Sequence, residues 1–337
     1  MTRRVPAALA ALLLALVVVP GCEMINASGS DALTVYSGRS EPLVGPLLER
    51  FKKQTGVKVE VKYAGTPELA NAILEEGKNT PADVFFSQDA GSLGALAANG
   101  RLEKLDRSLL ERVEARFRSD TGVWVGTSGR SRVVAFNPSR VSESELPPSV
   151  LDFTDAKWKG RLGWAPTNAS FESFVTALRV MRGEQVARDW LTGMKANRPA
   201  AYPNNITIVQ AVSRGEIDVG LVNHYYLYEL KAQDPNLRAA NHFFRGGDPG
   251  GLLNVAGVGI LAGTEKGKEA RRFAEFLLSK EAQEYFANTT YEYPLAEGVR
   301  PVAGLVPLEA LDPPRIDLSN LSDLRGTQKL LTDVGIL

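Results

Sequence analysis

The stretch LTVYSGRSEPLVGPLLERFKKQTGVKVEV, residues 33–61, decides the fold class. Residues 33–36 are typical of a buried strand, and residues 57–61 alternate apolar and charged side chains as a half-buried strand does. Apolar residues between the two recur at helical spacing and stop before Gly56, at Leu43, Leu47, Leu48 and Phe51. The stretch therefore predicts a strand, a helix and a second strand in that order.

The same alternation continues along the chain. We expect a helix over residues 67–76, a strand over 83–86 and a helix over 92–98. Two apolar stripes at helical spacing, within residues 171–181 and 186–194, are more typical of helices packed on a core than of cofactor sites. Strands that alternate with helices predict an α/β fold built on a parallel sheet.

Length and composition exclude several classes of protein. A chain of 337 residues, 44% of them hydrophobic, usually divides into two compact units. The 39 Lys and Arg balance the 39 Asp and Glu, so the sequence offers no basic face and we expect no nucleic-acid partner. One cysteine cannot form an internal disulfide, and two histidines cannot build a multi-histidine zinc centre.

The N-terminus has the features of a secretion signal. Arg3 and Arg4 precede residues 7–19, all of which are Ala, Leu or Val. This apolar stretch is shorter than the roughly 20 residues that a membrane-spanning helix requires. A cleavable signal peptide over residues 1–21 is therefore favoured over a membrane span.

The end of this segment, Val19-Pro-Gly-Cys22, resembles a bacterial lipobox, although leucine is usual in place of Val19. The resemblance implies cleavage before Cys22, a lipid on its thiol, and a tether over residues 22–31, which are rich in Asn, Ser and Gly. We therefore expect an extracytoplasmic protein that is lipid-anchored to the cell membrane, on its periplasmic or outer face. The alternative is an ordinary secretory signal with an incidental cysteine.

Sequence signatures of common enzymes are missing. No Gly-x-Ser-x-Gly and no His-Glu-x-x-His occurs, so a serine hydrolase of that type and a zincin have no support. A catalytic pair of carboxylates stays open, because 39 acidic residues offer many pairs whose distances a sequence does not reveal.

Two adjacent tyrosines, Tyr225 and Tyr226, follow the apolar strand expected at residues 218–222. At a strand-to-helix junction both phenol oxygens can point to one place, whereas within a strand they would face opposite ways. A phenolate is a hard oxygen donor suited to Fe³⁺, whose charge can remove the phenol proton. The alternative is a tyrosine pair packed at a helix edge with its hydroxyls in solvent.

Seven segments in this order resemble the periplasmic ferric-binding proteins of ABC importers. They are residues 33–40, 80–87, 128–137, 163–171, 223–226, 247–250 and 291–295. The resemblance implies a type II periplasmic-binding fold, in which two α/β lobes close on a ligand and hinge strands, here residues 131–136 and 253–261, cross between them. It divides the chain into a first lobe, residues 32–132 plus 254–305, and a second lobe, residues 133–253 plus 306–337.

The resemblance implies that Tyr225 and Tyr226 bind Fe³⁺ as phenolates. One branch of the family adds a His and a Glu, where this chain has Ser40 and Gln88, and another adds a third Tyr, where this chain has Asn168. Most of a six-coordinate Fe³⁺ shell is then left to water, to an added anion, or to a chelate carried in with the iron. The anion is the favoured of the three.

The resemblance also implies a site for carbonate or a similar synergistic anion. Its expected residues are Arg39, Ser40, Asn168, Ala169, Ser170, Asn205 and Asn223. A guanidinium fork suits a planar oxyanion, and amides at a helix start bind negative charge. The alternative role of Arg39 is a surface ion pair. The alternative role of Asn205, or of Asn223, is to cap a turn. For Arg130 and Arg132, anion binding and a salt bridge between lobes stay open, and His224 is a candidate donor behind the ligands.

We therefore expect a monomeric, non-enzymatic lipoprotein that captures Fe³⁺ with an anion and delivers it to an ABC permease. One alternative is a binding protein for a ferric chelate or another oxyanion-rich solute, with the tyrosines as a mere wall. The other is an extracytoplasmic lipoprotein enzyme with an unrecognised carboxylate pair.

Overall fold

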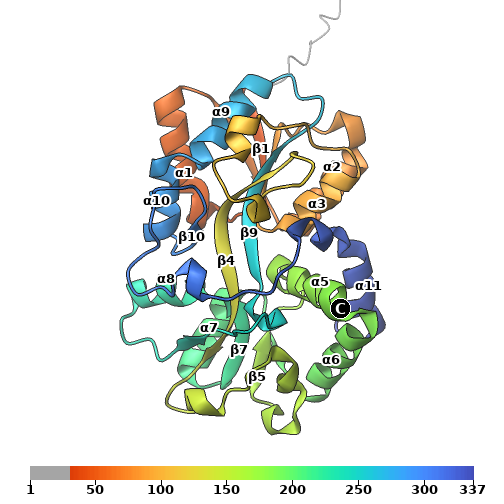
Figure 1. The fold of residues 1–337 in the computed structure, drawn as a ribbon, viewed down its shortest axis with the longest axis vertical. Helices are drawn as coiled ribbons and strands as arrows, with labels where there is room; N and C mark the ends of the chain where they lie inside the picture. The colour runs from red at the N-terminus through yellow and green to blue at the C-terminus, as the bar shows by residue number, and fades with distance from the viewer. Residues whose placement is uncertain (1–30) are drawn as a thin grey trace, which may run out of the picture. The chain divides into compact units, whose positions relative to one another are not determined.

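A computed structural model describes residues 31–337 of the protein (Figure 1). The expected signal peptide, Cys22 and almost all of the tether lie outside the described residues. The strands form a mixed sheet in the order β2-β1-β3-β9-β4-β7-β5-β6, with β8 and β10 also paired to β4. The predicted α/β class is confirmed, although the sheet is only partly parallel.

The first part of the chain folds as the opening stretch predicts. β1 (Leu33–Ser37), β2 (Val59–Tyr63) and β3 (Val84–Ser87) are parallel, with β1 in the middle. The helices between these strands are α1 (Glu41–Thr55) and α2 (Thr66–Glu76), and β3 is followed by α3 (Ala90–Ala98) and the short α4 (Arg107–Leu110). The predicted stripe of α1 is buried except for Leu43, which is half-buried, and the helix ends at Gly56, whose φ of 69° lies in the left-handed region that glycine tolerates.

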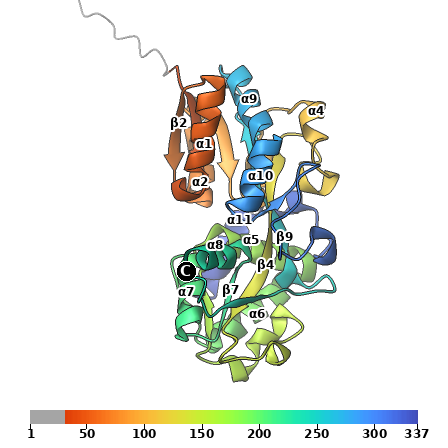
Figure 2. The same cartoon turned by 90° about the vertical axis from the view of Figure 1, so that its left-hand side faces the viewer.

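Two long strands link the two halves of the molecule. β4 (Val125–Phe136) pairs with β9 (Leu253–Ile260) through residue 131, and from residue 132 onward it pairs with β7 (Val219–Asn223). We call the strands on the β9 side, with their helices, lobe 1, and those on the β7 side lobe 2. Figures 1 and 2 show β4 and β9 running from one lobe to the other. The predicted two-lobed fold with crossing strands is confirmed.

Lobe 2 repeats the alternation of strands and helices. β5 (Leu162–Trp164) is parallel to both β6 (Ala200–Ala201) and β7, while β8 (Ala240–His242) runs antiparallel to β4. Its helices are α5 (Ala169–Arg182), α6 (Glu184–Ala196), α7 (Asn205–Arg214) and α8 (Tyr225–Gln233). The two apolar stripes predicted from sequence form the buried faces of α5 and α6, except that Val186 at the start of the second stripe is exposed.

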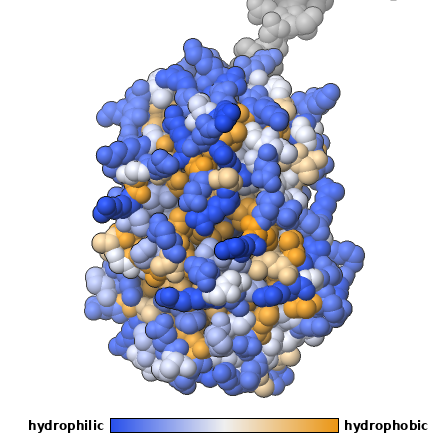
Figure 3. Space-filling model, viewed as in Figure 1, coloured by the Kyte–Doolittle hydropathy of each residue, from blue (hydrophilic) through white to orange (hydrophobic). Residues whose placement is uncertain are grey.

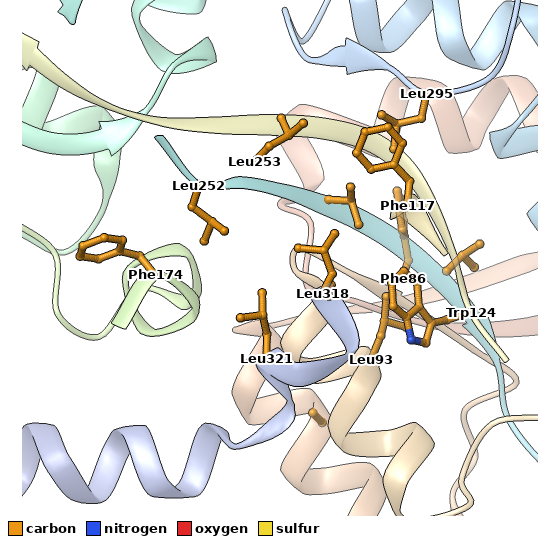
Figure 4. Packing of buried hydrophobic residues seen from close by; sticks show 14 of the residues in the cluster. Phe86, Leu93, Phe117, Trp124, Phe174, Leu252, Leu253, Leu295, Leu318 and Leu321 are labelled. Carbon is orange, nitrogen blue, oxygen red and sulfur yellow. The ribbon is translucent and has the colours of Figure 1, made fainter. Parts of the chain in front are cut away.

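After β9 the chain returns to lobe 1 and then crosses back. α9 (Gly267–Leu277), α10 (Lys280–Asn288) and β10 (Tyr293–Pro294) belong to lobe 1, and α11 (Leu324–Asp333) packs beside α5 (Figure 1). The 3₁₀ helix Leu318–Ser322 lies between β10 and α11 in the chain. Figure 4 shows its Leu318 and Leu321 among core side chains of both lobes. A Cβ on Gly91 would lie 2.4 Å from the carbonyl oxygen of Leu321, so this close approach requires glycine in α3.

The surface is mostly hydrophilic on the face of Figure 3, with apolar side chains gathered near the middle. Within residues 31–337 no helix is both long enough and apolar enough to cross a membrane.

Candidate metal and anion site

The tyrosine pair stands where β7 gives way to α8. β7 ends at Asn223, and α8 begins at Tyr225. Tyr225 is 0% exposed, and among residues 31–337 its Oη has no hydrogen-bond partner of regular geometry. The ring of Tyr226 lies 4.1 Å from that of Tyr225, centroid to centroid, at 33°. The rings therefore lie side by side, and the Tyr225 hydroxyl is buried rather than in solvent as the alternative had it.

Both tyrosines line a cavity of about 500 Å³ between the lobes, which we call the tyrosine cavity. Lobe 1 contributes the loop after β1, the start of α1 and the end of β2, while lobe 2 contributes α8 and the starts of α5 and α7. Its polar wall residues are Arg39, Ser40, Glu41, Tyr63, Gln88, Asn168, Asn204, Tyr225, Tyr226 and Glu229. Arg39, Ser40 and Asn168, which were predicted for the anion, thus share one cavity with the tyrosine pair.

The other residues predicted for the anion lie directly behind this wall in one hydrogen-bonded network. Asn168 caps α5, because its Oδ1 accepts from the backbone N–H of Ser170 at 3.1 Å and from the Ser170 hydroxyl at 2.6 Å. Asn205 donates from Nδ2 to the same Oδ1 at 3.2 Å and accepts from the backbone N–H of Asn223 at 3.1 Å. Ala169 is the first residue of α5. The starts of α5, α7 and α8 therefore converge on the cavity, where helix N-termini favour negative charge.

Arg39 is fully buried and is not the surface residue of the alternative interpretation. Its Nη2 lies 2.6 Å from Oε2 of Glu292, which is itself 0% exposed. Its Nε and Nη1 have no hydrogen-bond partner in the described part of the chain. Burial alone would lower the pKa of Arg39, but the nearby Glu292, Tyr225 and Tyr226 outweigh it and raise the pKa. The guanidinium is therefore charged and has two nitrogens free for a ligand.

Two more buried arginines stand on β4 nearby. Nη1 of Arg132 donates to the Ser170 hydroxyl and to Oδ1 of Asn223, both at 3.2 Å. Nε of Arg130 lies 3.9 Å from Oε1 of Glu292, and none of the Arg130 guanidinium nitrogens has a hydrogen-bond partner among the residues described. Burial, and next the charge of Arg130, lower the pKa of Arg132 to about 9. Arg130 thus lies beside the Arg39–Glu292 ion pair. Arg132 instead joins the hydrogen-bonded network behind the cavity wall, through Ser170 and Asn223.

The charges at this site are unbalanced. Three buried guanidiniums stand here, and within residues 31–337 Glu292 is the one carboxylate at salt-bridge distance from any of them. Buried charges require partners, so the site favours a ligand that brings negative charge. Burial, and next the neighbouring Tyr225, raise the pKa of Tyr226 well above its usual value, whereas Arg39 and Arg130 lower it. Without a cation this phenol therefore keeps its proton at neutral pH.

His224 ties the tyrosine helix of lobe 2 to lobe 1. Its Nδ1 accepts from the backbone N–H of Ser131 at 3.2 Å, and its Nε2 lies 2.9 Å from the carbonyl oxygen of Tyr291, so Nε2 carries the proton. Burial lowers the pKa of His224 to about 3. Tyr291 has a φ of 56°, a strained conformation that places its carbonyl on His224 one residue before Glu292. Both ring nitrogens of His224 are thus occupied by backbone groups, and its role as a donor behind the ligands stays a prediction.

Sequence reasoning missed Glu292, Asn204, Tyr63 and Glu229. Glu292 falls in the segment 291–295 that carries the resemblance, but nothing in the sequence marks its pairing with Arg39, 253 residues away. Asn204 precedes Asn205 and caps α7, and only the neighbouring asparagine was noted. In the described residues no three His, Cys, Asp or Glu side chains gather as a metal site. A cation in the tyrosine cavity would therefore depend on phenol oxygens.

A family model for bacterial extracellular solute-binding proteins matches residues 79–308. The chain belongs to this family. The solute-binding protein is also 34% identical over 315 residues to the Fe(3+)-binding periplasmic protein of Serratia marcescens, covering 92% of each chain. It is 35% identical over 312 residues to the major ferric iron-binding protein of Neisseria meningitidis, covering 90% of this chain and 93% of that one.

Solved structures of such proteins share the fold of this solute-binding protein. Iron-bound HitA from Pseudomonas aeruginosa superposes with a TM-score of 0.86 at 36% identity, over 90% of this chain and 99% of that one. The Trichodesmium protein IdiA (FutA), in complex with iron and citrate, gives 0.76 at 30% identity, over 90% and 99%. The predicted resemblance to periplasmic ferric-binding proteins is confirmed.

Proposed function

We propose that this solute-binding protein captures Fe³⁺ with an anion in the tyrosine cavity, with Tyr225 and Tyr226 as phenolate ligands. The observation that carries the proposal is the buried, unpartnered hydroxyl of Tyr225 beside Tyr226 in a cavity that Arg39 also lines. A buried hydroxyl without a hydrogen bond costs about 1–3 kcal/mol, which binding a cation would recover. The names of the ferric-binding relatives from Serratia and Neisseria support the same cargo.

Charge explains why a trivalent cation and an anion would bind together. Fe³⁺ replaces the phenol protons, as metal ions do when they bind to deprotonated ligands. Two phenolates leave one positive charge on the metal, and the guanidiniums around it are already in excess. An added anion then contacts both the iron and the free Nε and Nη1 of Arg39. Ser40, Asn168, Ala169, Ser170, Asn205 and Asn223 are the remaining residues that we propose for the anion subsite or its support.

Carbonate is the first candidate for the anion, and a ferric chelate is the second. The size of the cavity favours the ferric chelate, because about 500 Å³ is far more space than one carbonate fills. Gln88, Ser40 and Asn168 on its wall are neutral, so the protein supplies no further charged ligand at these positions. The Trichodesmium relative was solved with iron and citrate, which supports a polycarboxylate as the alternative.

The two lobes provide a route for capture and release. We propose that lobe 1, residues 32–132 plus 254–305, and lobe 2, residues 133–253 plus 306–337, rotate about β4 and β9. Closure would bring Arg39 and Ser40 of lobe 1 onto iron held by α8 of lobe 2 and exclude water. Docking on an ABC permease would then favour reopening, as suits a family of extracellular solute-binding proteins.

We place the protein outside the cytoplasm as a monomer, anchored to the membrane by a lipid on Cys22 after removal of residues 1–21. No enzymatic step is needed for this function, and the matched relatives are named as binding proteins. The enzyme alternative would require turnover of a substrate without iron.

The test is a titration of the purified protein with ferric nitrilotriacetate in three buffers: one with carbonate, one stripped of carbonate, and one stripped of carbonate but containing citrate. We expect one iron per protein and tighter retention with carbonate. Retention that is equal in both buffers but rises with citrate would select the chelate alternative. Absence of binding in all three buffers would contradict the proposal.

A further inference from the structure

We propose that Glu229 is a third protein ligand of the metal in the tyrosine cavity, an inference that rests on the proposed function. The carboxylate would occupy one of the coordination positions that Ser40, Gln88 and Asn168 cannot fill with a charged group. All three protein ligands would then come from one helix.

The position of Glu229 on α8 brings it to the tyrosine pair. It follows Tyr225 by four residues and Tyr226 by three, and residues at these spacings are neighbours on one helix face. Helical side chains also lean toward the N-terminus, which here is the end that carries the tyrosines. All three side chains line the tyrosine cavity. A long carboxylate side chain at this position can therefore reach a cation held by the phenol oxygens.

The carboxylate of Glu229 has no competing partner. It is half-buried, and among residues 31–337 it makes no hydrogen bond and no ion pair. Its charged neighbours are Glu292, which repels it, and Arg39, which is already paired with Glu292. A partly desolvated carboxylate beside a second carboxylate is unfavourable unless a cation joins it. A structural salt bridge therefore does not explain its place in the cavity wall.

The chemistry of the resulting set matches the cargo. Two phenolates and one carboxylate supply three hard, anionic oxygens, which balance the charge of Fe³⁺. The unpartnered hydroxyl of Tyr225, which is fully buried in the same wall, points independently to a ligand at this place. The excess guanidinium charge of Arg39, Arg130 and Arg132 then remains for the anion.

The placement of all three proposed ligands on one helix determines whether the metal binds before or after the lobes close. Because Tyr225, Tyr226 and Glu229 all lie on α8 in lobe 2, the open protein already presents every protein ligand that we assign. Closure would add only the anion contacts of Arg39 and Ser40 from lobe 1. Metal capture would thus precede closure.

The test compares Glu229→Gln with Glu41→Gln. Glu41 lines the same cavity from the start of α1 but is exposed, so its variant makes the same change of charge in the same wall. Each purified protein is loaded with ferric nitrilotriacetate, its visible absorption is recorded, and its iron is titrated out with EDTA. Thermal unfolding of the iron-free proteins checks that both variants fold.

We expect Glu229→Gln to lower iron affinity at least about tenfold, a loss typical of altered metal surroundings. It should also move the tyrosine-to-iron absorption to longer wavelength, because iron that loses an anionic donor accepts charge more readily. Glu41→Gln should leave the band where it is in the parent and weaken binding less than Glu229→Gln does, because an exposed carboxylate on the wall acts on the metal only through its charge. An unmoved band in Glu229→Gln, with or without weaker binding, would overturn the ligand role while leaving the proposed function intact. A parent protein without any such band would instead contradict the proposed function itself.

Discussion

Nη2 of Arg39 and Oε2 of Glu292 lie 2.6 Å apart, and both side chains are completely withdrawn from solvent. The pair joins the loop after β1 to the segment between α10 and β10, and Thr290 donates a further hydrogen bond to the same oxygen at 2.8 Å. It leaves Nε and Nη1 of the guanidinium buried and without a hydrogen-bond partner among residues 31–337. The anion subsite that we propose depends on this pair.

Glu292→Gln should therefore destabilise the protein strongly. It leaves the guanidiniums of Arg39 and Arg130 buried without a counter-charge, and breaking a buried pair costs about 3–5 kcal/mol. The matched control is Glu281→Gln, which breaks the exposed pair with Arg50 and should cost less than about 1 kcal/mol. Urea unfolding of the iron-free proteins measures both. Equal free energies of unfolding for the two variants would contradict the role of the pair.

Arg39→Ala should weaken iron retention mainly when carbonate is the anion. The variant removes the counter-charge of the anion, so added carbonate should no longer slow the loss of iron to a chelator. Arg107→Ala, a change at a fully exposed arginine of lobe 1, should behave as the parent does. Stopped-flow release at several carbonate concentrations gives the comparison. A carbonate effect of undiminished size in Arg39→Ala refutes the assignment.

His224 should make the stability of the protein decrease as pH decreases from about 6.5 toward 3. Burial lowers its pKa to about 3, whereas an unfolded histidine has a pKa near 6.5. Between these values the unfolded chain binds the extra proton, so this residue removes about 1.4 kcal/mol of stability for each unit that pH falls from about 6.5 toward 3. His224→Gln should lose stability at pH 7.5 through its broken hydrogen bonds, yet show a shallower slope below pH 6.5.

Urea unfolding at pH values from 7.5 to 4 checks this prediction. His242, the other of the two histidines, is partly exposed, so His242→Gln should change the slope less. A slope in His224→Gln that matches the parent would show that His224 does not titrate on unfolding.

The anchoring prediction concerns Cys22, the single cysteine of the chain. Mass spectrometry of protein extracted from membranes should find a diacylglyceryl group on an N-terminal Cys22. Cys22→Ser should release the protein from the membrane or leave its leader uncut. Soluble protein with an unmodified cysteine, or one that begins elsewhere, would show that the leader is an ordinary secretory signal.

Local patterns in the sequence predicted the elements that position the site. The stripe of α1 and the strands β1, β2 and β3 carry enough periodic residues to be recognised. The strands of two or three residues, β5, β6, β8 and β10, are too short to show a period and were not predicted. Tertiary pairing, which no local pattern records, defines them: β8 and β10 pair with β4, β5 pairs with β7, and β6 pairs with β5.

The site was predictable where adjacent residues form it and unpredictable where distant ones meet. Tyr225 and Tyr226 are neighbours in the chain, so their shared direction at a strand-to-helix junction could be inferred. The pairing of Arg39 with Glu292 joins residues 253 positions apart, and only the fold shows it. Arg130 and Arg132 have the same local pattern, yet β4 changes its neighbouring strand from β9 to β7 just after residue 131, so they reach different partners.

The most direct measurement of the central claim is the visible absorption spectrum of the iron-loaded protein and of its Tyr225→Phe, Tyr226→Phe double variant. Phenolate bound to Fe³⁺ gives a broad visible band that iron-free protein and free ferric salt lack. The parent should show this band, and it should bleach in acid, because protons compete for phenolate oxygens. The double variant keeps the ring packing, so it should unfold nearly as the parent does but lose both the band and tight binding. Iron-loaded parent without a visible band, or a double variant that binds iron as tightly as the parent, would contradict the account.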